Sequence, residues 1–208
     1  MIKIYVEQGS EAWFQSRLGR ITASKFKDLI SGESTLGYKG LIVDVAAEIV
    51  SGEIEETFTD FNMERGNDLE PEARETYAKL FEIKVEQIGF CIPDEDNEFH
   101  DWIGISPDGG MNKFKQLLEI KCPKKRTHWN YIKANKLPSA YKPQVQAQLF
   151  VTGAEYCDFM SYYPNMKPFV HRVYPDEEMF KMFKERLRIT ITRIKEEIEG
   201  YKKYDYLD

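Results

Sequence analysis

Hydrophobic positions recur every three or four residues through the first third of the chain, a spacing that predicts helices. Ser10 is a suitable N-cap for the first helix, and Gly19 a suitable stop. The helices expected in this part run from Ser10 to Gly19, after Thr22 or Ser24, from Leu41 to Gly52, and from Asp68 to Phe81 with Pro71 in the first turn.

The pattern then changes to short apolar and alternating runs, which predict strands. Two helices and two more strands follow, and the chain closes with a long amphipathic helix. The expected strands are 83–92, 102–105, 116–121, 159–163 and 169–174; the expected helices are 128–134, 139–151 and the segment carrying Met179, Phe183, Leu187, Ile191, Ile194 and Ile198. This order predicts an α/β or α+β fold with a central mixed sheet flanked by helices.

Composition narrows the function classes only slightly. The 208 residues suit one domain, which we expect to span 1–208, and the net charge is −6. That charge argues against a general nucleic-acid coat protein but leaves a nuclease open, because metal-binding carboxylates are themselves acidic. Three scattered cysteines argue against a disulfide framework or a Cys-rich zinc site. We find no signal peptide or membrane-length apolar run, so the expected location is the cytoplasm.

One group of charged residues points to chemistry. Asp108 lies in a Ser-Pro-Asp-Gly turn after a short apolar strand, and Glu119 and Lys121 lie in the next strand. Residues two apart in a strand share a face, so Glu119 and Lys121 project together while Ile120 turns to the core. Carboxylates that hold Mg²⁺, with a cation that orients or deprotonates water, are what phosphodiester hydrolysis needs.

The spacing alone is a loose pattern, and it also fits a turn aspartate followed by a structural ion pair. Two observations favour the functional interpretation. Glu119 and Lys121 lie in a run that otherwise looks buried, where charges cost stability unless they are paired or used. The turn around Asp108 also contains Gly109, whose lack of a side chain lets a metal approach the backbone.

Four segments, in order, resemble the phage lambda exonuclease or YqaJ-type viral recombinase group of the PD-(D/E)xK nucleases. Together they span roughly residues 7 to 146. They are Glu7 to Trp13 leading into Arg17 to Ser24; Gly66 with Glu70, Ala73 and Arg74; Ser106 to Gly109 with Leu118 to Pro123; and Ala140-Tyr141 with Gln144 to Gln146. The resemblance implies a restriction-endonuclease-like core.

The resemblance also implies roles for the charged residues. Asp108 and Glu119, with the backbone carbonyl of Ile120, would ligate two Mg²⁺ ions, for which Mn²⁺ can substitute. Lys121 would position or activate the attacking water. Glu70 would lie at the edge of the metal site, and Gln144 would order it from the following helix. Without the resemblance, Glu70 is an ordinary acidic residue in the first turn of a helix, and Gln144 and Gln146 are polar surface residues.

The same resemblance places Arg17, Ser24 and Ser106 around a 5′-terminal phosphate. An arginine fork and free N–H groups near Ser24 suit that anion, although Arg17 could also be a solvated helix end and Ser24 only a cap. Two further roles are not implied by the resemblance. Trp13 could wedge against a terminal base or belong to the core, and the basic cluster that opens with Lys124 and Lys125 could follow the DNA backbone or begin a solvated helix.

The implied activity is Mg²⁺-dependent 5′-to-3′ digestion of one strand of linear duplex DNA. It releases mononucleotides and leaves a 3′ single strand for a phage annealing protein, and the implied assembly is a ring-shaped homotrimer. Two alternatives stay open: another PD-(D/E)xK nuclease acting on single strands or particular DNA structures, and a non-catalytic DNA-end binder that loads a recombinase. The second has no need for Asp108, Glu119 and Lys121 together.

Overall fold

A four-stranded mixed sheet forms the centre of the protein. The computed structural model describes residues 1–54 and 61–204, and for 61–64 the backbone alone. The strand order is β5 (Gly109–Met111), β6 (Gln116–Lys121), β7 (Tyr156–Ser161) and β8 (Phe169–Val173). β6 and β7 are parallel, and the two outer pairs are antiparallel. A mixed sheet with helices around it confirms the predicted fold class.

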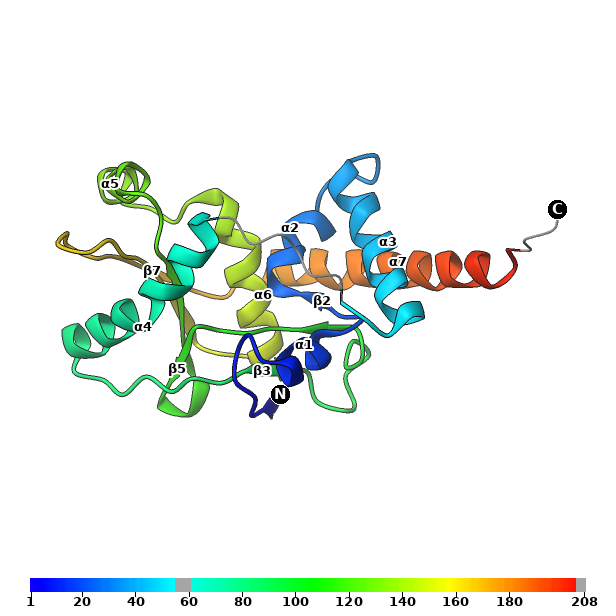
Figure 1. Ribbon diagram of the computed structural model, residues 1–208, viewed down its shortest axis with the longest axis horizontal. Helices are drawn as coiled ribbons and strands as arrows, with labels where there is room; N and C mark the ends of the chain where they lie inside the picture. Colours follow the sequence, from blue (N-terminus) through cyan, green and yellow to red (C-terminus); the bar gives the residue numbers. More distant parts are fainter. Residues whose placement is uncertain (55–60, 205–208) are drawn as a thin grey trace.

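Helices cover both faces of this sheet (Figure 1). α4 (Phe61–Phe81) packs Ala73 and Tyr77 against Leu118 and Ile120 of β6. On the other face, α6 (Lys142–Thr152) belongs to the larger apolar cluster that also contains Leu117. Successive residues of β6 therefore serve opposite layers, as the pleat of a strand requires. Glu119 shares the side of the sheet on which α6 lies.

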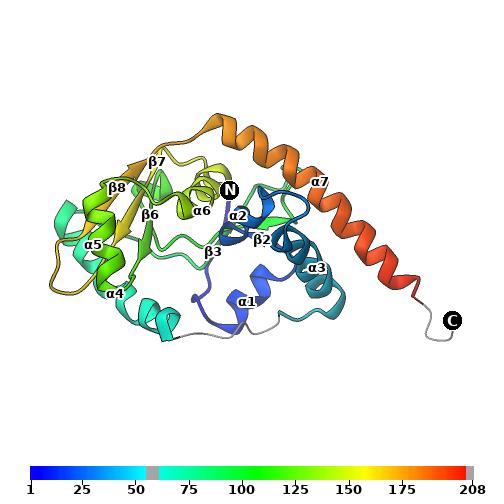
Figure 2. The same ribbon diagram turned by 90° about the horizontal axis from the view of Figure 1, so that it is seen from above.

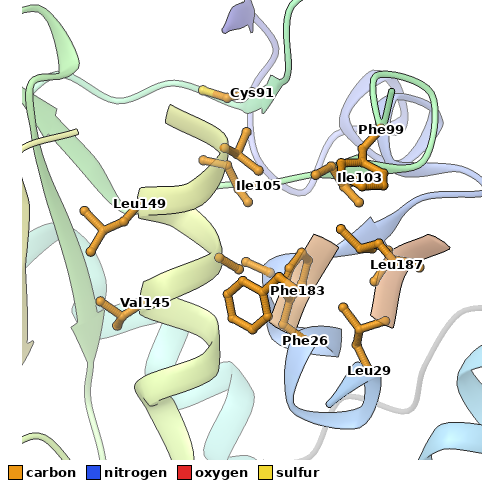
Figure 3. Close-up of a cluster of buried hydrophobic side chains, with 14 of the residues drawn as sticks. Phe26, Leu29, Cys91, Phe99, Ile103, Ile105, Val145, Leu149, Phe183 and Leu187 are labelled. Atoms are coloured by element: carbon orange, nitrogen blue, oxygen red, sulfur yellow. The ribbon is translucent and has the colours of Figure 1, made fainter. Parts of the chain in front are cut away.

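A second group of elements extends the larger cluster away from the sheet. α7 (Glu177–Lys202) packs along this cluster and then runs out toward the C-terminus (Figures 1 and 2). Phe183 and Leu187 of α7 lie beside Phe26 and Leu29 of α2 (Phe26–Leu29) in Figure 3. The Phe26 and Phe183 rings meet edge to face at 4.8 Å. The buried face of α7 confirms the predicted amphipathic helix.

The remaining elements connect these layers. Short pairs β1–β3 and β2–β4 link the N-terminal segment to the middle of the chain. Their bounds and those of the other elements are β1 (Ile2–Ile4), α1 (Glu11–Arg17), β2 (Ile21–Thr22), η1 (Ala23–Lys25), α3 (Leu36–Ser51), β3 (Phe90–Ile92), β4 (Ile103–Gly104), η2 (Asn112–Phe114), α5 (Lys125–Ala134) and η3 (Ser139–Tyr141).

Two local predictions were wrong. α4 begins at Phe61, so Pro71 lies inside the helix and not in its first turn. The helix continues because Pro71 is exposed and residues on either side of it are held by tertiary contacts, such as the bond from Arg65 to the Cys122 carbonyl. The strand expected over 83–92 is confined to β3, with one isolated bridge from Glu86 to Gly110.

Over the described ranges, no helix combines the length and apolar character needed to cross a membrane.

Candidate active site

Asp108 and Glu119 face each other across the β5–β6 pair. Gly109 pairs with Leu118 in antiparallel register, which sets the preceding residue, Asp108, opposite Glu119. Asp108 Oδ2 accepts a hydrogen bond of 2.6 Å from the backbone N–H of Ile120. This bond joins the turn before β5 to β6. Two carboxylates therefore converge at one end of the sheet, as the sequence predicted.

Glu119 is fully buried, and three side chains hold its carboxylate. Gln144 Nε2 donates to Oε1 at 2.6 Å, and Gln148 Nε2 donates to Oε2 at 2.5 Å. Lys121 Nζ forms an ion pair with Oε1. A carboxylate has about four lone-pair sites, so one site on Glu119 is still open to another ligand.

Lys121 lies at the mouth of this cluster, partly exposed. Its ammonium group is 5.7 Å from the centre of the Tyr141 ring. Burial acts to lower the pKa of Lys121, but the negative charges of Glu119 and Asp108 outweigh it and raise the pKa. The side chain is therefore a cation at neutral pH, suited to orient an oxygen nucleophile or a phosphate oxygen.

Arg74 connects α4 to the same centre. Its Nε donates to the backbone carbonyl of Asp108 at 2.7 Å, and its Nη2 forms an ion pair with Glu70. Glu70 is half-buried beside Glu119 and Lys121, and burial raises its pKa. The helix thus presents a third carboxylate to the centre and fixes it through an arginine one turn further along.

The centre carries more negative charge than its cations balance. Burial, followed by the charges of Glu119 and Glu70, raises the pKa of Asp108 well above its usual range. Carboxylates that raise each other's pKa stabilise a bound cation, because the cation relieves both the burial and the repulsion. The electrostatics of the site therefore fit a divalent metal.

The donor set also indicates which metal. Within the described residues, no three His, Cys, Asp or Glu side chains are arranged as a metal site on their own. Asp108 and Glu119 contribute two carboxylates, and the backbone carbonyl of Ile120 directly follows Glu119 in the sequence. Such hard oxygen donors, with no cysteine or histidine among them, suit Mg²⁺ or Mn²⁺ better than zinc.

A second cluster gathers residues predicted for the 5′ end of DNA. The Trp13 indole N–H lies 2.9 Å from Ser106 Oγ and 3.0 Å from the Gly89 carbonyl. The Arg17 guanidinium stacks over the Trp13 ring, 4.0 Å from its centre. Burial lowers the pKa of Arg17, against the opposing charge of Glu48. Because Ser106 is two residues from Asp108, this cluster adjoins the carboxylates.

None of the described hydrogen bonds or ion pairs joins Ser24, Lys124 or Lys125 to the carboxylates. Ser24 is exposed, and its hydroxyl lies 3.3 Å from Thr22 Oγ1. Thr22 itself is the N-cap of η1 but makes no side-chain capping bond. Lys124 is the N-cap of α5 and Lys125 its first residue, and both are exposed close to the end of β6.

The sequence prediction missed two residues of the site. Gln148 is one turn after Gln144, on the same helix face, and this spacing was the available signal. Arg74 was named only as part of a family motif. The prediction that Gln146 lies on the surface was wrong: it is buried, and its amide bonds the Tyr174 carbonyl and the Asp176 N–H. The opposite side of α6 packs there, away from Glu119.

Comparison with known proteins agrees with this architecture. An alkaline exonuclease, LHK-Exo from Laribacter hongkongensis, superposes with a TM-score of 0.83 at 29% identity, covering 93% of this chain and 96% of that one. Its complex with dAMP matches equally well. A phage-related exonuclease from Haemophilus somnus shares the fold, with a TM-score of 0.64 at 14% identity over 88% of this chain and 96% of that one. No curated protein sequence matches the chain.

The α/β fold is therefore that of lambda-exonuclease-like nucleases. The model of the YqaJ-like viral recombinase domain matches residues 12–155, and the chain belongs to that family. Both findings confirm the resemblance inferred from the sequence.

Proposed function

We propose that this protein is a Mg²⁺-dependent exonuclease that digests one strand of linear duplex DNA from the 5′ end. The observation that carries the proposal is the convergence of Asp108, Glu119 and Lys121 at one end of the β5–β6 pair. A purely structural ion pair would need neither the second carboxylate nor the surplus negative charge. Family membership and the likeness to an alkaline exonuclease support the choice of DNA as substrate.

Asp108, Glu119 and the Ile120 carbonyl would hold the metal, with Glu70 at its edge. Mg²⁺, for which Mn²⁺ substitutes, would lower the pKa of a bound water and neutralise charge on the scissile phosphate. Two ions fit the number of carboxylates. The protein's own part is to keep Glu119 fixed through Gln144 and Gln148 and to keep Asp108 fixed through Ile120 N–H.

Lys121 is the residue that would act on the nucleophile. Its positive charge at the mouth of the centre would orient the attacking water and stabilise charge that develops on the phosphate. Arg74 has no role in that step, since it is occupied by Glu70 and the Asp108 carbonyl. It instead positions the acidic groups from the side of α4.

The Arg17–Trp13–Ser106 cluster would receive the 5′ end. The Arg17 guanidinium lies over the Trp13 ring, and its N–H groups can bind a terminal phosphate in bidentate fashion. Ser24 would add a hydroxyl, and Trp13 would stack near the terminal base. Lys124 and Lys125 would contact the DNA backbone beyond the centre.

The wider proposal follows the family. Residues 1–208 would act as one nuclease domain in a homotrimeric ring in the cytoplasm, and the 3′ single strand would pass to an annealing recombinase. The dAMP bound by LHK-Exo is a mononucleotide of the kind such digestion releases. It supports mononucleotides as the product here.

The test is digestion of a linear duplex with one phosphorylated 5′ end and a separate label on each strand, with and without Mg²⁺. We expect mononucleotides only from the phosphorylated strand, only with metal, and none from an Asp108→Asn variant purified in the same way. Release from the 3′ end would contradict the polarity, and cleavage of closed circular DNA would favour an endonuclease. Tight binding of DNA ends without cleavage in Mg²⁺ or Mn²⁺ would favour a recombinase loader.

A further inference from the structure

The region that follows the catalytic strand has an unusual charge balance. Residues 120–154 contain no aspartate or glutamate, although the chain as a whole has a net charge of −6. The segment carries seven basic residues: Lys121, Lys124, Lys125, Arg126, Lys133, Lys136 and Lys142. The acidic excess of the protein therefore lies elsewhere, and this region is the one that favours a polyanion.

α5 and its N-cap carry four of these seven basic residues, and one exposed tryptophan lies among them. Trp129 is 62% exposed, and Ile132 beside it is 37% exposed. Lys125 and Lys133 lie four residues before and after Trp129, so all three share one face of the helix. An exposed aromatic ring between two cations is the combination with which proteins stack a nucleic-acid base and hold its phosphates.

The opposite face of α5 is anchored, which fixes the direction of Trp129. His128 is fully buried, with Nδ1 2.8 Å from Ser161 Oγ and Nε2 3.1 Å from the Lys167 carbonyl. Tyr131 packs against the larger core cluster. The helix cannot turn to bury Trp129 without breaking these contacts.

α5 is also close to the catalytic strand. It begins four residues after Lys121, and Arg65 of α4 donates to the carbonyls of Cys122 and Pro123 between them. Figures 1 and 2 both place α5 at the end of the molecule opposite the C-terminus, on the outside of the sheet. A DNA strand that leaves the catalytic centre on this side would meet α5.

We propose that the exposed face of α5 (Lys125, Arg126, Trp129, Ile132 and Lys133) binds single-stranded DNA, with an unpaired base stacked on Trp129. This inference rests on the proposed function, which generates such a strand. Single-stranded DNA is the occupant that the surface favours, because an exposed ring between cations binds a base and its phosphates together. Within duplex DNA each base is already stacked on both faces, and only the terminal base pair leaves a face free.

The test is binding of fluorescently labelled oligo-dT and of a blunt duplex, measured by anisotropy without divalent metal so that no cleavage occurs. Trp129→Ala should weaken oligo-dT binding by roughly 5- to 150-fold, the range for loss of one base stack, and leave duplex binding nearly unchanged. Trp129→Phe should retain most of the affinity. Tyr5→Ala, which removes another exposed aromatic residue, should have no effect.

The charged neighbours give a second readout. Lys133→Gln should reduce the salt dependence of oligo-dT binding by about 0.7 in the log–log slope, the value for one phosphate contact on a single strand. Unchanged oligo-dT binding by Trp129→Ala, or equal losses on single strand and duplex, would overturn the proposal. A smaller assembly of Trp129→Ala in sedimentation would also overturn it, by making Trp129 a subunit contact. Failure of the digestion assay with normal oligo-dT binding would refute the exonuclease and leave this surface intact.

Discussion

Gln148 offers the sharpest test of how the site is held, because nothing else contacts Glu119 Oε2 among the described hydrogen bonds. The substitution Gln148→Met keeps the length and approximate shape of the side chain but removes the amide. Glu119 then keeps Gln144 and Lys121 on Oε1. Its second oxygen is buried without a donor, and the carboxylate is free to rotate away from Asp108.

The expected magnitude comes from the burial of both groups. Gln148 and Glu119 are each fully buried, so water cannot replace the lost bond. A hydrogen bond to a buried charged group contributes about 1.5–3 kcal/mol to stability. For a chain of this size, that corresponds to a decrease in melting temperature of roughly 3–12 °C. Loss of a residue that orients a metal ligand typically lowers activity or metal affinity by about 10- to 100-fold.

The assay separates positioning from general damage. We would measure kcat and KM for duplex DNA over a series of Mg²⁺ concentrations, and the melting temperature with and without Mg²⁺. Gln148→Met should lose kcat and need more Mg²⁺, with little change in the KM for DNA. Mg²⁺ should also raise its melting temperature less than it raises that of the unmodified protein.

Gln146→Met is the matched control. Gln146 is buried in the same helix and uses both ends of its amide, but its partners are Tyr174 and Asp176. It should lose comparable stability and keep its kcat and its Mg²⁺ response. Equal effects of the two variants on kcat would refute the reasoning, because Gln148 would then act only through the stability of α6.

Three further predictions test other parts of the site. Asp108→Asn keeps an acceptor for the Ile120 N–H but removes a carboxylate whose pKa is raised by burial and by Glu119. It should abolish cleavage and raise the melting temperature of the metal-free protein by about 2–4 °C. A lower melting temperature would contradict the surplus of negative charge at the centre. Arg17→Ala should erase the preference for a phosphorylated 5′ end, as seen in paired digestions; equal loss on both ends would exclude Arg17 from phosphate binding. Burial lowers the pKa of His128, so the unfolded chain binds a proton first as pH falls, and the free energy of unfolding should decrease below about pH 6.5. His128→Gln should flatten that dependence in urea titrations at pH 5 and 7.5; an unchanged dependence in this variant would exclude the buried His128 as its cause.

Much of the site could be predicted from the sequence because its key residues are close together in the chain. The alternation of β6 alone sets Glu119 and Lys121 on one side and Ile120 on the other, as the structure has them. The turn chemistry around Asp108 likewise limits where that carboxylate can lie. The four ordered segments sufficed to identify the family, which the matched model confirms.

Element boundaries were less predictable where tertiary contacts override local preference. Gly66 and Pro71 weaken the helical pattern on either side of Asp68, yet α4 runs through them because its inner face packs on β6. The apolar residues of 83–92 look like one strand. Only the part that forms β3 is paired along its length, because β1 offers three residues for pairing and all three lie opposite β3.

The sequence by itself determined the chemistry this protein carries: a carboxylate in a turn, a Glu-x-Lys strand, and an acid-free basic stretch after it. Only the tertiary structure decided which neighbours hold those groups. Gln144, Gln146 and Gln148 have the same side chain. The packing of α6 on the sheet turns two of them toward Glu119 and one toward Tyr174. Helical periodicity gives the faces of α6, whereas the direction each face takes depends on strands that lie far away in the chain.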